Sequence, residues 1–391
     1  MSAMTIRRKA FIVGAYEHPR REIPDLSVAE IQAEVALAAL ADAGLRPSDV
    51  DAYFCDSDAP GVGALSMAEY LGLRCRYIDT TETGGASYLS HVGHAAAAIA
   101  LGKCQVALCV MGGRPRSLRQ ASGPDLSGAP ETPYETPWGI TDTVHNYALA
   151  AMRHMHEFGT TSRQLAEVKV AASLHARHNP NAFLRTPVTV DDVVNSPMIS
   201  DPLHRLDCCV MTDGGGAVVI ASAEVARRLS RRSVAVLGHG EAAKGTGNGR
   251  PDVTYTAAVW SGPAAFAEAG VTPADIDYAS IYDSFTITAL MALEDLGFCE
   301  KGKGGSFVQD GALLAPHGRL PMNTDGGGLC NNQPDNRGGM ARMIEAVRQL
   351  RGEAAAPVQV PDCRLAVVHG SGGRLATRSS AATLILGRED A

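Results

Sequence analysis

Two side chains able to move protons follow buried strands in the second half of this 391-residue chain. Tyr282 comes directly after the run Tyr278-Ala-Ser-Ile281, and His369 follows Leu365-Ala-Val-Val368. A phenol or an imidazole beside polar groups can act as a general acid or base, so both are candidates for proton transfer. Each has a simpler alternative role, a single hydrogen bond inside the core. The adjacent Asp283 is expected to cap or orient backbone rather than to act as a base.

The nine cysteines argue against both a disulfide framework and a zinc site. They are scattered, several lie within apolar runs, and no CxxC pair occurs. We expect most of them to be small core residues. The helical histidines His154, His156, His175 and His178 have no clear carboxylate or cysteine at ligand spacing, so no metal site is expected.

One structural unit occurs twice in the chain. Residues 39–51 recur as residues 265–277, with seven of the thirteen positions identical. Each copy predicts the last turns of an alanine-rich helix, a glycine stop, a Pro-Xaa-Asp turn and a buried strand, which is 52–55 or 278–281. A duplicated α/β half normally places its site where the two copies meet.

The repeat extends further along both halves. A glycine-rich loop, a small-residue helix and an apolar strand follow in each half, at 83–87, about 92–101 and 106–113 in the first and at 325–328, about 338–350 and 365–373 in the second. Short apolar runs between helices indicate strands covered on both faces. Helices rich in Ala and Gly can pack closely, so we expect two sheets that share a helical middle layer.

Composition and charge exclude several classes of protein. The chain has 35 Lys and Arg against 42 Asp and Glu, a net charge of −7, so no basic field favours nucleic acid or an anionic membrane. The apolar run 10–15 is too short for a signal peptide, and no stretch approaches a transmembrane span. We expect a cytoplasmic protein.

The middle of the chain departs from the repeat. Residues 114–138 are dense in Pro, Gly and Ser and predict a surface loop, followed by helices over about 146–158 and 165–178 with Thr161 or Ser162 as a cap. This insertion is suited to line a substrate site, although it could also be a simple connector. The expected division is an N-terminal half of 1–113 with 206–235, the insertion 114–205, and a C-terminal half of 236–391.

The duplicated βαβαβαββ plan resembles the thiolase superfamily. Several motifs resemble its branch related to sterol-carrier-protein thiolases, among them Asn179-Pro-Asn-Ala182, Ser200-Asp-Pro-Leu203, Leu206-Asp-Cys-Cys209 and Tyr282-Asp-Ser-Phe285. The last stands where that branch usually has His-Asp-Cys-Phe. The resemblance runs from residue 10 to residue 387 and implies an α/β fold, a five-layered α-β-α-β-α sandwich of two duplicated halves.

The same resemblance shows that three thiolase residues are replaced. Gly85 stands at the position of the nucleophilic cysteine, Gln333 replaces the histidine of a Gly-His-Pro turn, and Val368, beside His369, aligns with the second cysteine. Gly85 has no side chain to attack with, and Ser87 would need an adjacent base at neutral pH. Covalent acyl transfer through this loop is therefore unavailable.

The resemblance still implies a pocket that stabilises the enolate of a coenzyme A thioester, which enters as substrate; no covalently bound cofactor is expected. The expected pocket contains backbone N–H groups of the glycine-rich turns and polar side chains, at Gly85, Ser87, Asn332, Gln333, Gly370 and Gly372. Enolate stabilisation permits retro-aldol cleavage of a β-hydroxyacyl-CoA, with Tyr282 and His369 as the acid and the base.

Some thiolase-like proteins that lack the nucleophile are aldolases of bacterial steroid side-chain breakdown, and they associate with a small OB-fold and zinc-ribbon protein. This chain is similar to them in its Gly84-Gly85 loop and in residues 291–299, but it departs at Asn331-Asn-Gln-Pro334, where those aldolases tend to have a tyrosine. The resemblance implies such a partner protein, and the family habit of pairing central sheets implies a homodimer.

Three hypotheses follow from these observations. The first is a retro-aldol lyase acting on a β-hydroxyacyl-CoA. The second is a thiolase or Claisen-type acyltransferase that uses another cysteine, for which Cys330 beside the glycine-rich turn is the candidate. The third is a non-catalytic scaffold that binds acyl-CoA or lipid.

Overall fold

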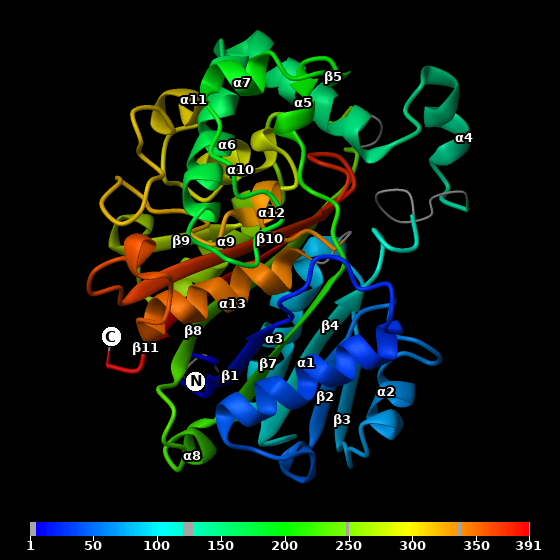
Figure 1. Ribbon diagram of the computed structural model, residues 1–391, viewed down its shortest axis with the longest axis vertical. Coiled ribbons are helices and arrows are strands. Elements are labelled where there is room, and N and C mark those ends of the chain that lie inside the picture. The colour runs from blue at the N-terminus through cyan, green and yellow to red at the C-terminus, as the bar shows by residue number, and fades with distance from the viewer. Residues whose placement is uncertain (1–4, 120–127, 248–249, 335–337, 391) are drawn as a thin grey trace.

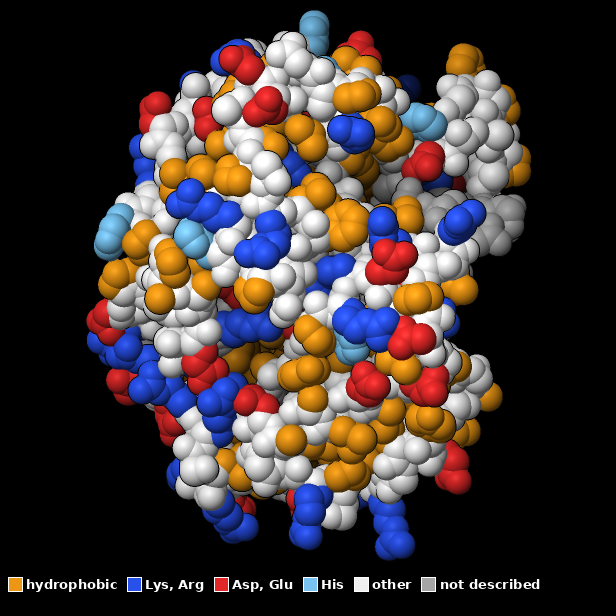
Figure 2. Space-filling view, viewed as in Figure 1, with side chains coloured by type: hydrophobic (Ala, Val, Ile, Leu, Met, Phe, Trp, Pro, Cys, Tyr) orange, Lys and Arg blue, Asp and Glu red, His pale blue; other side chains and the backbone are white. Residues whose placement is uncertain are grey.

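A nine-stranded mixed sheet runs through the computed structural model, which describes residues 5–119, 128–247, 250–334 and 338–390 (Figure 1). The strand order is β3-β2-β4-β7-β1-β8-β11-β10-β9, so the first five strands come from the N-terminal half and the last four from the C-terminal half. The halves join at β1 and β8, where Phe11 pairs with Ala235 and Ile12 with Val234. Figure 2 shows acidic and basic side chains intermixed on the viewed face.

The N-terminal half consists of five strands and the helices that connect them. They are β1 (Ala10–Glu17), α1 (Val28–Ala43), β2 (Ala52–Cys55), α2 (Ala64–Tyr70), β3 (Tyr77–Thr80), α3 (Ser87–Ala100), β4 (Val106–Gly113), β7 (Gly214–Ser222) and α8 (Ala223–Ala226). Local signals explain their limits. Ser27 caps α1 in a capping box with Glu30, and Gly44 ends that helix in the left-handed conformation at φ 72°.

The C-terminal half repeats this plan. Its elements are β8 (Val234–Lys244), α9 (Ala258–Ala269), β9 (Tyr278–Ile281), α10 (Thr286–Asp295), α11 (Gly304–Phe307), α12 (Gly327–Cys330), α13 (Gly338–Arg351), β10 (Leu365–Gly373) and β11 (Ser379–Arg388). Gly270 ends α9 at φ 68°, as Gly44 ends α1. The repeat predicted from the sequence is therefore confirmed down to the helix stop and the following strands.

A pair of equivalent aspartates shows how closely the halves correspond. Asp51 accepts hydrogen bonds from the backbone N–H groups of Gln105 and Val106 at the start of β4. Asp277 accepts from Arg364 and Leu365 at the start of β10, at 2.8 and 2.9 Å. Each aspartate thus ties the turn before one strand to the beginning of the neighbouring parallel strand.

The helices form the layers of the sandwich. Helix α1 packs on strands β1, β4 and β7, and α9 packs on β8 and β11. Helices α3 and α13 contact each other and contact strands of both halves, so they form the middle layer (Figure 1). Glycines in the strands permit this packing, because a Cβ at Gly238 or Gly240 would lie 2.2 or 2.1 Å from a backbone oxygen of α9. The five-layered sandwich is confirmed, with the two expected sheets continuous through β1 and β8 rather than separate.

The insertion lies over the C-terminal half, at the top of Figure 1. It contains α4 (Thr132–Glu135), α5 (Thr143–Phe158), α6 (Ser162–Ala176), α7 (Val190–Val194), β5 (Met198–Ser200) and β6 (Leu203–His204). Thr161 caps α6, as the sequence predicted. Buried polar contacts anchor the insertion, since His154 lies 3.0 Å from Glu294 of α10 and Lys169 donates to the backbone oxygen of Leu329.

Two boundaries differ from the sequence prediction. Helix α3 begins at Ser87 rather than near residue 92, because the polar and aromatic residues that follow the loop are buried and already helical. The predicted surface loop contains the short helix α4, and residues 120–127 of that loop lie outside the described part of the chain. Within the described ranges, no helix combines the length and apolar character needed to cross a bilayer.

Candidate active site

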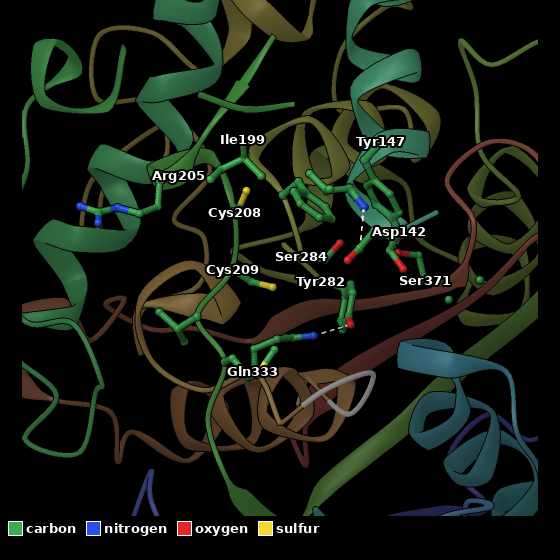
Figure 3. Close-up of a pocket in the computed structure, with 17 residues that line it drawn as sticks. Asp142, Tyr147, Ile199, Arg205, Cys208, Cys209, Tyr282, Ser284, Gln333 and Ser371 are labelled. Carbon is green, nitrogen blue, oxygen red and sulfur yellow. Dashed lines mark hydrogen bonds between the residues drawn. The ribbon is translucent and has the colours of Figure 1, made fainter. Parts of the chain in front are cut away.

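A cavity of about 310 Å³ lies where the insertion meets the C-terminal half (Figure 3). Its walls come from three parts of the chain: Asp142, Thr143, Val144, Tyr147, Ile199 and Arg205 of the insertion; Cys208, Cys209, Val210 and Met211 before β7; and Tyr282, Ser284, Phe285, Gln333, Ser371, Gly372 and Gly373 of the C-terminal half. A cavity of this size with mainly apolar walls and a few convergent polar groups is typical of a small-molecule site.

The ring of Tyr282 fills the space that a side chain at residue 85 would need. A Cβ built on Gly85 would lie 2.5 Å from Cε2 and 2.6 Å from Cζ of Tyr282, and 2.6 Å from the backbone oxygen of Ser371. Real Cβ atoms essentially never approach other atoms so closely. Gly85 and Tyr282 are therefore complementary, since a cysteine at residue 85 is incompatible with this position of the tyrosine.

Gln333 holds the phenolic oxygen of Tyr282. Its Nε2 donates a hydrogen bond to Tyr282 Oη, and both side chains are 4% exposed at the cavity wall (Figure 3). The backbone of Gln333 exchanges two hydrogen bonds with Thr212, one to its hydroxyl at 3.0 Å and one from its N–H at 3.3 Å. Gly338 leaves room for the amide, because a Cβ there would lie 2.0 Å from Gln333 Oε1.

A buried ionic network supports the turn that carries Gln333. Glu17 at the end of β1 accepts from Arg21 at 2.7 Å, from Arg348 at 3.1 Å and from Asn332 at 2.9 Å. Although burial alone would raise the pKa of Glu17, the two arginines lower it to about 2. The side-chain oxygen Oδ1 of Asn332 accepts a hydrogen bond from the hydroxyl of Thr212. Asn332 is therefore held inside this network and does not line the cavity. The predicted donation by its amide to a thioester is therefore corrected.

His369 is also corrected, because it lies outside the cavity. Its side chain is 1% exposed, and Nδ1 lies 3.0 Å from the hydroxyl of Thr383, which in turn contacts Ser261 of α9. Burial lowers the pKa of His369 to about 4. The imidazole therefore faces the outer helical layer as a neutral group. Ser371, two residues further along β10, reaches the cavity instead.

The predicted pocket on the glycine-rich turns is only partly formed. Gly372 lines the cavity, whereas Gly85, Ser87 and Gly370 do not. Ser87 Oγ accepts from the backbone N–H of Thr83 at 2.8 Å and so closes the turn before α3. A Cβ at Gly370 would lie 2.7 Å from the Gly85 oxygen, so this glycine permits close packing of β10 against the turn.

Asp283 orients backbone, as the sequence indicated. Its carboxylate accepts from the N–H groups of Gly328 at 2.6 Å and Leu329 at 3.3 Å and thereby caps α12. Burial raises the pKa of Asp283, and Arg342, 4.0 Å away, opposes that rise. Asp283 is 1% exposed and does not line the cavity, so it stabilises the turn beside Tyr282.

The cysteines differ from the sequence interpretation. Cys330 is 1% exposed, burial raises the pKa of its thiol, and it does not line the cavity. Cys208 and Cys209 do line it, and Figure 3 shows the sulfur of Cys209 directed toward the side of Tyr282. Burial raises the pKa of Cys208 to about 12, and its thiol donates to the backbone oxygen of His204. Sequence reasoning missed both residues, although the Leu206-Asp-Cys-Cys209 motif marked them.

Sequence reasoning also missed a second phenol. Tyr147 of α5 lines the cavity, is 3% exposed, and packs against Phe285 with ring centroids 4.5 Å apart. Burial raises the pKa of Tyr147 to about 12, and the neighbouring Ser284 hydroxyl opposes that rise. Only the position of α5 over the cavity brings this tyrosine to the site, and the amphipathic pattern of the helix does not reveal it.

The described residues contain no group of three or more His, Cys, Asp or Glu side chains that could hold a metal ion.

The basic loop around Arg114 and Arg116 packs against protein instead of facing the cavity. Arg116 lies 3.5 Å from Glu22 and stacks on Phe183, with its guanidinium carbon 4.5 Å from the ring centroid. Arg114 donates to the backbone oxygen of Pro24.

The sequence and the fold of the chain resemble those of several known proteins. The family model described as thiolase C-terminal domain-like matches residues 241–388. The chain is 37% identical, over 84% of its length and 88% of the relative, to the 17-hydroxy-3-oxo-4-pregnene-20-carboxyl-CoA lyase of Mycobacterium tuberculosis. It is 33% identical, over 97% of its length and all of the relative, to an acetyl-CoA acetyltransferase of Methanothermobacter thermautotrophicus.

A solved structure titled Ltp2-ChsH2(DUF35) aldolase superposes on the chain with a TM-score of 0.88. The superposition covers 99% of this chain and 100% of that one, at 31% identity. These relatives are named as a CoA lyase, an acetyl-CoA acetyltransferase and an aldolase, so the expectation of an enzyme is confirmed. The chain belongs to the thiolase superfamily, in the branch that includes the proteins similar to sterol-carrier-protein thiolases.

Proposed function

We propose that this enzyme cleaves the Cα–Cβ bond of a β-hydroxyacyl-CoA by a retro-aldol reaction without a covalent cysteine intermediate. The observation that carries the proposal is the ring of Tyr282 in the space that a side chain at residue 85 would occupy. A thiolase nucleophile and this tyrosine exclude each other, and the chain has the tyrosine. The relatives named as a lyase and an aldolase support the same chemistry.

In the proposed reaction, Tyr282 as a phenolate takes the proton of the β-hydroxyl group and becomes the neutral phenol. Gln333 donates a hydrogen bond to its phenolic oxygen, and such a donor favours negative charge on that oxygen. When the O–H bond breaks, its electron pair forms the new C=O bond and the Cα–Cβ bond breaks. The released pair delocalises onto the thioester oxygen as an enolate. Protonation of the α-carbon then completes the acyl-CoA product.

Stabilisation of the enolate is the step that the remaining cavity walls support. Gln333 and the backbone at Gly372 and Gly373 present polar groups to a space whose other walls are largely apolar. In such a water-poor site, one well-placed donor is typically worth ~3 kcal/mol of transition-state stabilisation. A coenzyme A thioester is therefore the proposed substrate.

The walls also suggest the class of acyl group. Val144, Ile199, Met211 and Phe285 form an apolar surface that suits a bulky hydrocarbon rather than a charged substituent. One relative is named for a pregnene, which is a steroid skeleton. We therefore propose an acyl-CoA whose departing ketone or aldehyde is large and apolar, as in steroid side-chain breakdown. The insertion 114–205 would form the substrate-facing wall.

Cys209 favours a second candidate function, a Claisen-type acyl transfer. Its sulfur faces the cavity, and one relative is named as an acetyl-CoA acetyltransferase. This replaces Cys330 as the cysteine of the alternative, because Cys330 is buried away from the cavity. A non-catalytic scaffold is not favoured, because the relatives of this chain are named as enzymes.

The experiment is a direct comparison of matched substrates. A panel of β-hydroxyacyl-CoA thioesters and the corresponding β-ketoacyl-CoA thioesters is incubated with the protein, and the carbonyl and acyl-CoA products are quantified. We expect cleavage of β-hydroxy substrates, and we expect the Cys209→Ala variant to retain it. Thiolysis of β-keto substrates that requires Cys209 and is blocked by iodoacetamide would replace the lyase proposal with the acyltransferase.

A partner protein is part of the proposal. The solved relative is titled as an assembly of Ltp2 with ChsH2(DUF35), which is consistent with the expected small OB-fold and zinc-ribbon partner. Purification of tagged protein from its native cells, followed by mass spectrometry, should recover such a chain in stoichiometric amount. Recovery of the enzyme without it, with full activity, would remove the partner from the proposal.

We also propose a homodimer that pairs the edges of two sheets. Strand β3 ends the nine-stranded sheet, and apolar side chains beside it are exposed, with Ile78 at 46%, Leu65 at 60% and Tyr70 at 58%. Exposed edge strands with apolar neighbours are common association surfaces. Light scattering should give twice the chain mass, and Ile78→Lys should give a monomer. A monomeric wild type would contradict this.

A further inference from the structure

Tyr147 lines the same cavity as Tyr282 and is as deeply buried, although it belongs to the insertion rather than to the duplicated fold. Its ring packs on Phe285 at 4.5 Å with an interplanar angle of 42°, and it is 3% exposed. Ser284, the neighbour of Phe285, lies on the same wall of the cavity, and its hydroxyl lies 3.1 Å from that of Thr288. The phenol is therefore fixed in position and in contact with the cavity.

Ser284 connects the two phenols of the site. Tyr282 and Ser284 are two residues apart in the segment that leaves β9, and both line the cavity. Because Tyr147 packs on Phe285, the residue after Ser284, it lines the same cavity as Tyr282. A substrate bound against that wall meets both tyrosines.

The environments of the two phenols suit opposite tasks. Tyr282 receives a hydrogen bond from Gln333 on its oxygen, which favours charge there. Burial raises the pKa of Tyr147 to about 12, which keeps its proton in place at neutral pH. The nearby Arg374 acts in the opposite sense and favours the phenolate that would form after proton release. Two titratable groups in such different environments are typical of an acid and base pair.

The retro-aldol reaction needs a second proton carrier, and the structure removes the one that the sequence suggested. His369 is buried against Thr383 outside the cavity. We propose that Tyr147 is the catalytic acid that protonates the α-carbon of the enolate, an inference that rests on the proposed function. The O–H bond of Tyr147 breaks as the C–H bond forms, and the enolate electron pair becomes that bond. The proton that Tyr282 has taken then returns to Tyr147 through solvent.

Hydrogen exchange tests this step separately from bond cleavage. The protein is incubated with acetyl-CoA or propionyl-CoA in D₂O, and deuterium at the α-carbon is followed by mass spectrometry. In this exchange, the α-carbon loses a proton to give the enolate and is then protonated again with deuterium. No C–C bond has to break. We expect Tyr147→Phe to lower both exchange and cleavage by about 100-fold or more, the range for a lost general acid.

Two variants serve as controls. Tyr282→Phe should lose cleavage but keep exchange within a few-fold of wild type, because its task is the β-hydroxyl proton. Tyr53→Phe removes a buried hydroxyl that has no hydrogen-bond partner among the described residues and does not line the cavity, so it should keep both activities. Tyr147→Phe keeps the ring that packs on Phe285, so its fold should be intact by circular dichroism.

The outcomes separate this inference from the proposed function. Wild-type exchange in Tyr147→Phe, or wild-type cleavage in that variant where exchange is undetectable, would overturn the role of Tyr147. The role of Tyr147 would also be overturned if Tyr282→Phe lost exchange while Tyr147→Phe kept it. A wild-type protein that exchanges but cleaves no β-hydroxyacyl-CoA, with exchange lost in Tyr147→Phe, would refute the lyase proposal and leave Tyr147 as the acid.

Discussion

The ends of the duplicated strands β2 and β9 differ in a way that separates scaffold from site. Asp56 follows β2 at the position that Tyr282 occupies after β9, and each belongs to a polar pair. Asp56 accepts a hydrogen bond from the hydroxyl of Tyr88, and both side chains are buried, at 2% and 0% exposure. Tyr282 accepts from Gln333 at the wall of a cavity. The same backbone therefore carries a closed structural pair in one half and an accessible chemical pair in the other.

The covering segments explain the difference. Over the N-terminal pair, Tyr88 is part of α3 itself, and His91 of the same helix lies edge-on to its ring at 5.7 Å. Over the C-terminal pair, the insertion contributes Val144 and Tyr147 to a cavity wall and leaves about 310 Å³ of space. The duplication supplies the frame, and the segment that is not duplicated turns one copy into a site.

The largest changes are expected when the tyrosine hydroxyl of each polar pair is removed. We predict that Tyr282→Phe lowers kcat for β-hydroxyacyl-CoA cleavage by about 1000-fold, because it removes a proton-transfer group, and leaves thermal stability nearly unchanged. Tyr88→Phe should do the reverse. It takes a donor from the buried Asp56 carboxylate, so the free energy of unfolding should fall by about 2 kcal/mol while activity per folded molecule is kept. Steady-state kinetics and urea unfolding measure the two effects, and equal loss of activity in both variants would contradict the distinction.

The next effect concerns the space beneath Tyr282. Gly85→Ala places a Cβ within 2.6 Å of the ring and of the Ser371 oxygen, so the tyrosine must move. We predict about 100-fold lower kcat, since small displacements of a catalytic group are costly, together with a lower Tm. Gly72→Ala is a stricter control, because its φ of 65° is unfavourable, unlike that of Gly85, while no atom lies within 4 Å of an added Cβ. That control should lose about 1 kcal/mol of stability and no activity. Full activity in Gly85→Ala would refute the complementarity of residues 85 and 282.

A smaller effect contrasts the partly buried His94 of the first half with the buried His369 of the second half through pH. Hydrogen bonds with Glu241 and Asp79 raise the pKa of His94 from 6.5 to about 9, so its contribution to stability is full below pH 6.5 and is lost as the pH rises through 9. Burial lowers the pKa of His369 to about 4, so its contribution is lost as the pH falls from 6.5 toward 4. Thermal unfolding against pH should show a weaker alkaline decline in His94→Gln and a weaker acid decline in His369→Gln. Unchanged profiles would contradict these environments.

The smallest expected effect is on turnover. His369→Gln and Cys330→Ala both alter groups that the sequence singled out for chemistry and that the structure places outside the cavity. We predict kcat within a few-fold of wild type for each, with the same dependence on pH. A large loss of kcat without unfolding in either variant would return that residue to the mechanism.

The fold was predictable because local signals and a repeat agree on it. Strands 52–55 and 278–281, the stops at Gly44 and Gly270 and the shared middle layer all follow from residues 39–51 and their copy. Such signals depend on neighbouring residues, so a single sequence can reveal them.

The site was predictable only where it lies on the duplicated frame. Tyr282 and Gln333 follow from the strand end and from the family turn. The prediction that His369 lines the cavity is wrong, because Ser371 is the side chain of β10 that reaches it. Which residue of β10 faces the cavity depends on the layers that cover the strand. Tyr147 and Cys209 were missed because the fold of the insertion over the cavity, and not their local pattern, makes them neighbours of Tyr282.

Intact-protein mass spectrometry during turnover tests the central claim most directly. The enzyme is mixed with a cleaved β-hydroxyacyl-CoA, quenched in acid at intervals shorter than one turnover, and weighed while the carbonyl product is quantified in the same samples. We predict that product forms while the protein mass stays unchanged at every time. An acyl adduct that appears and decays at the rate of turnover, and that maps to Cys209, would contradict it.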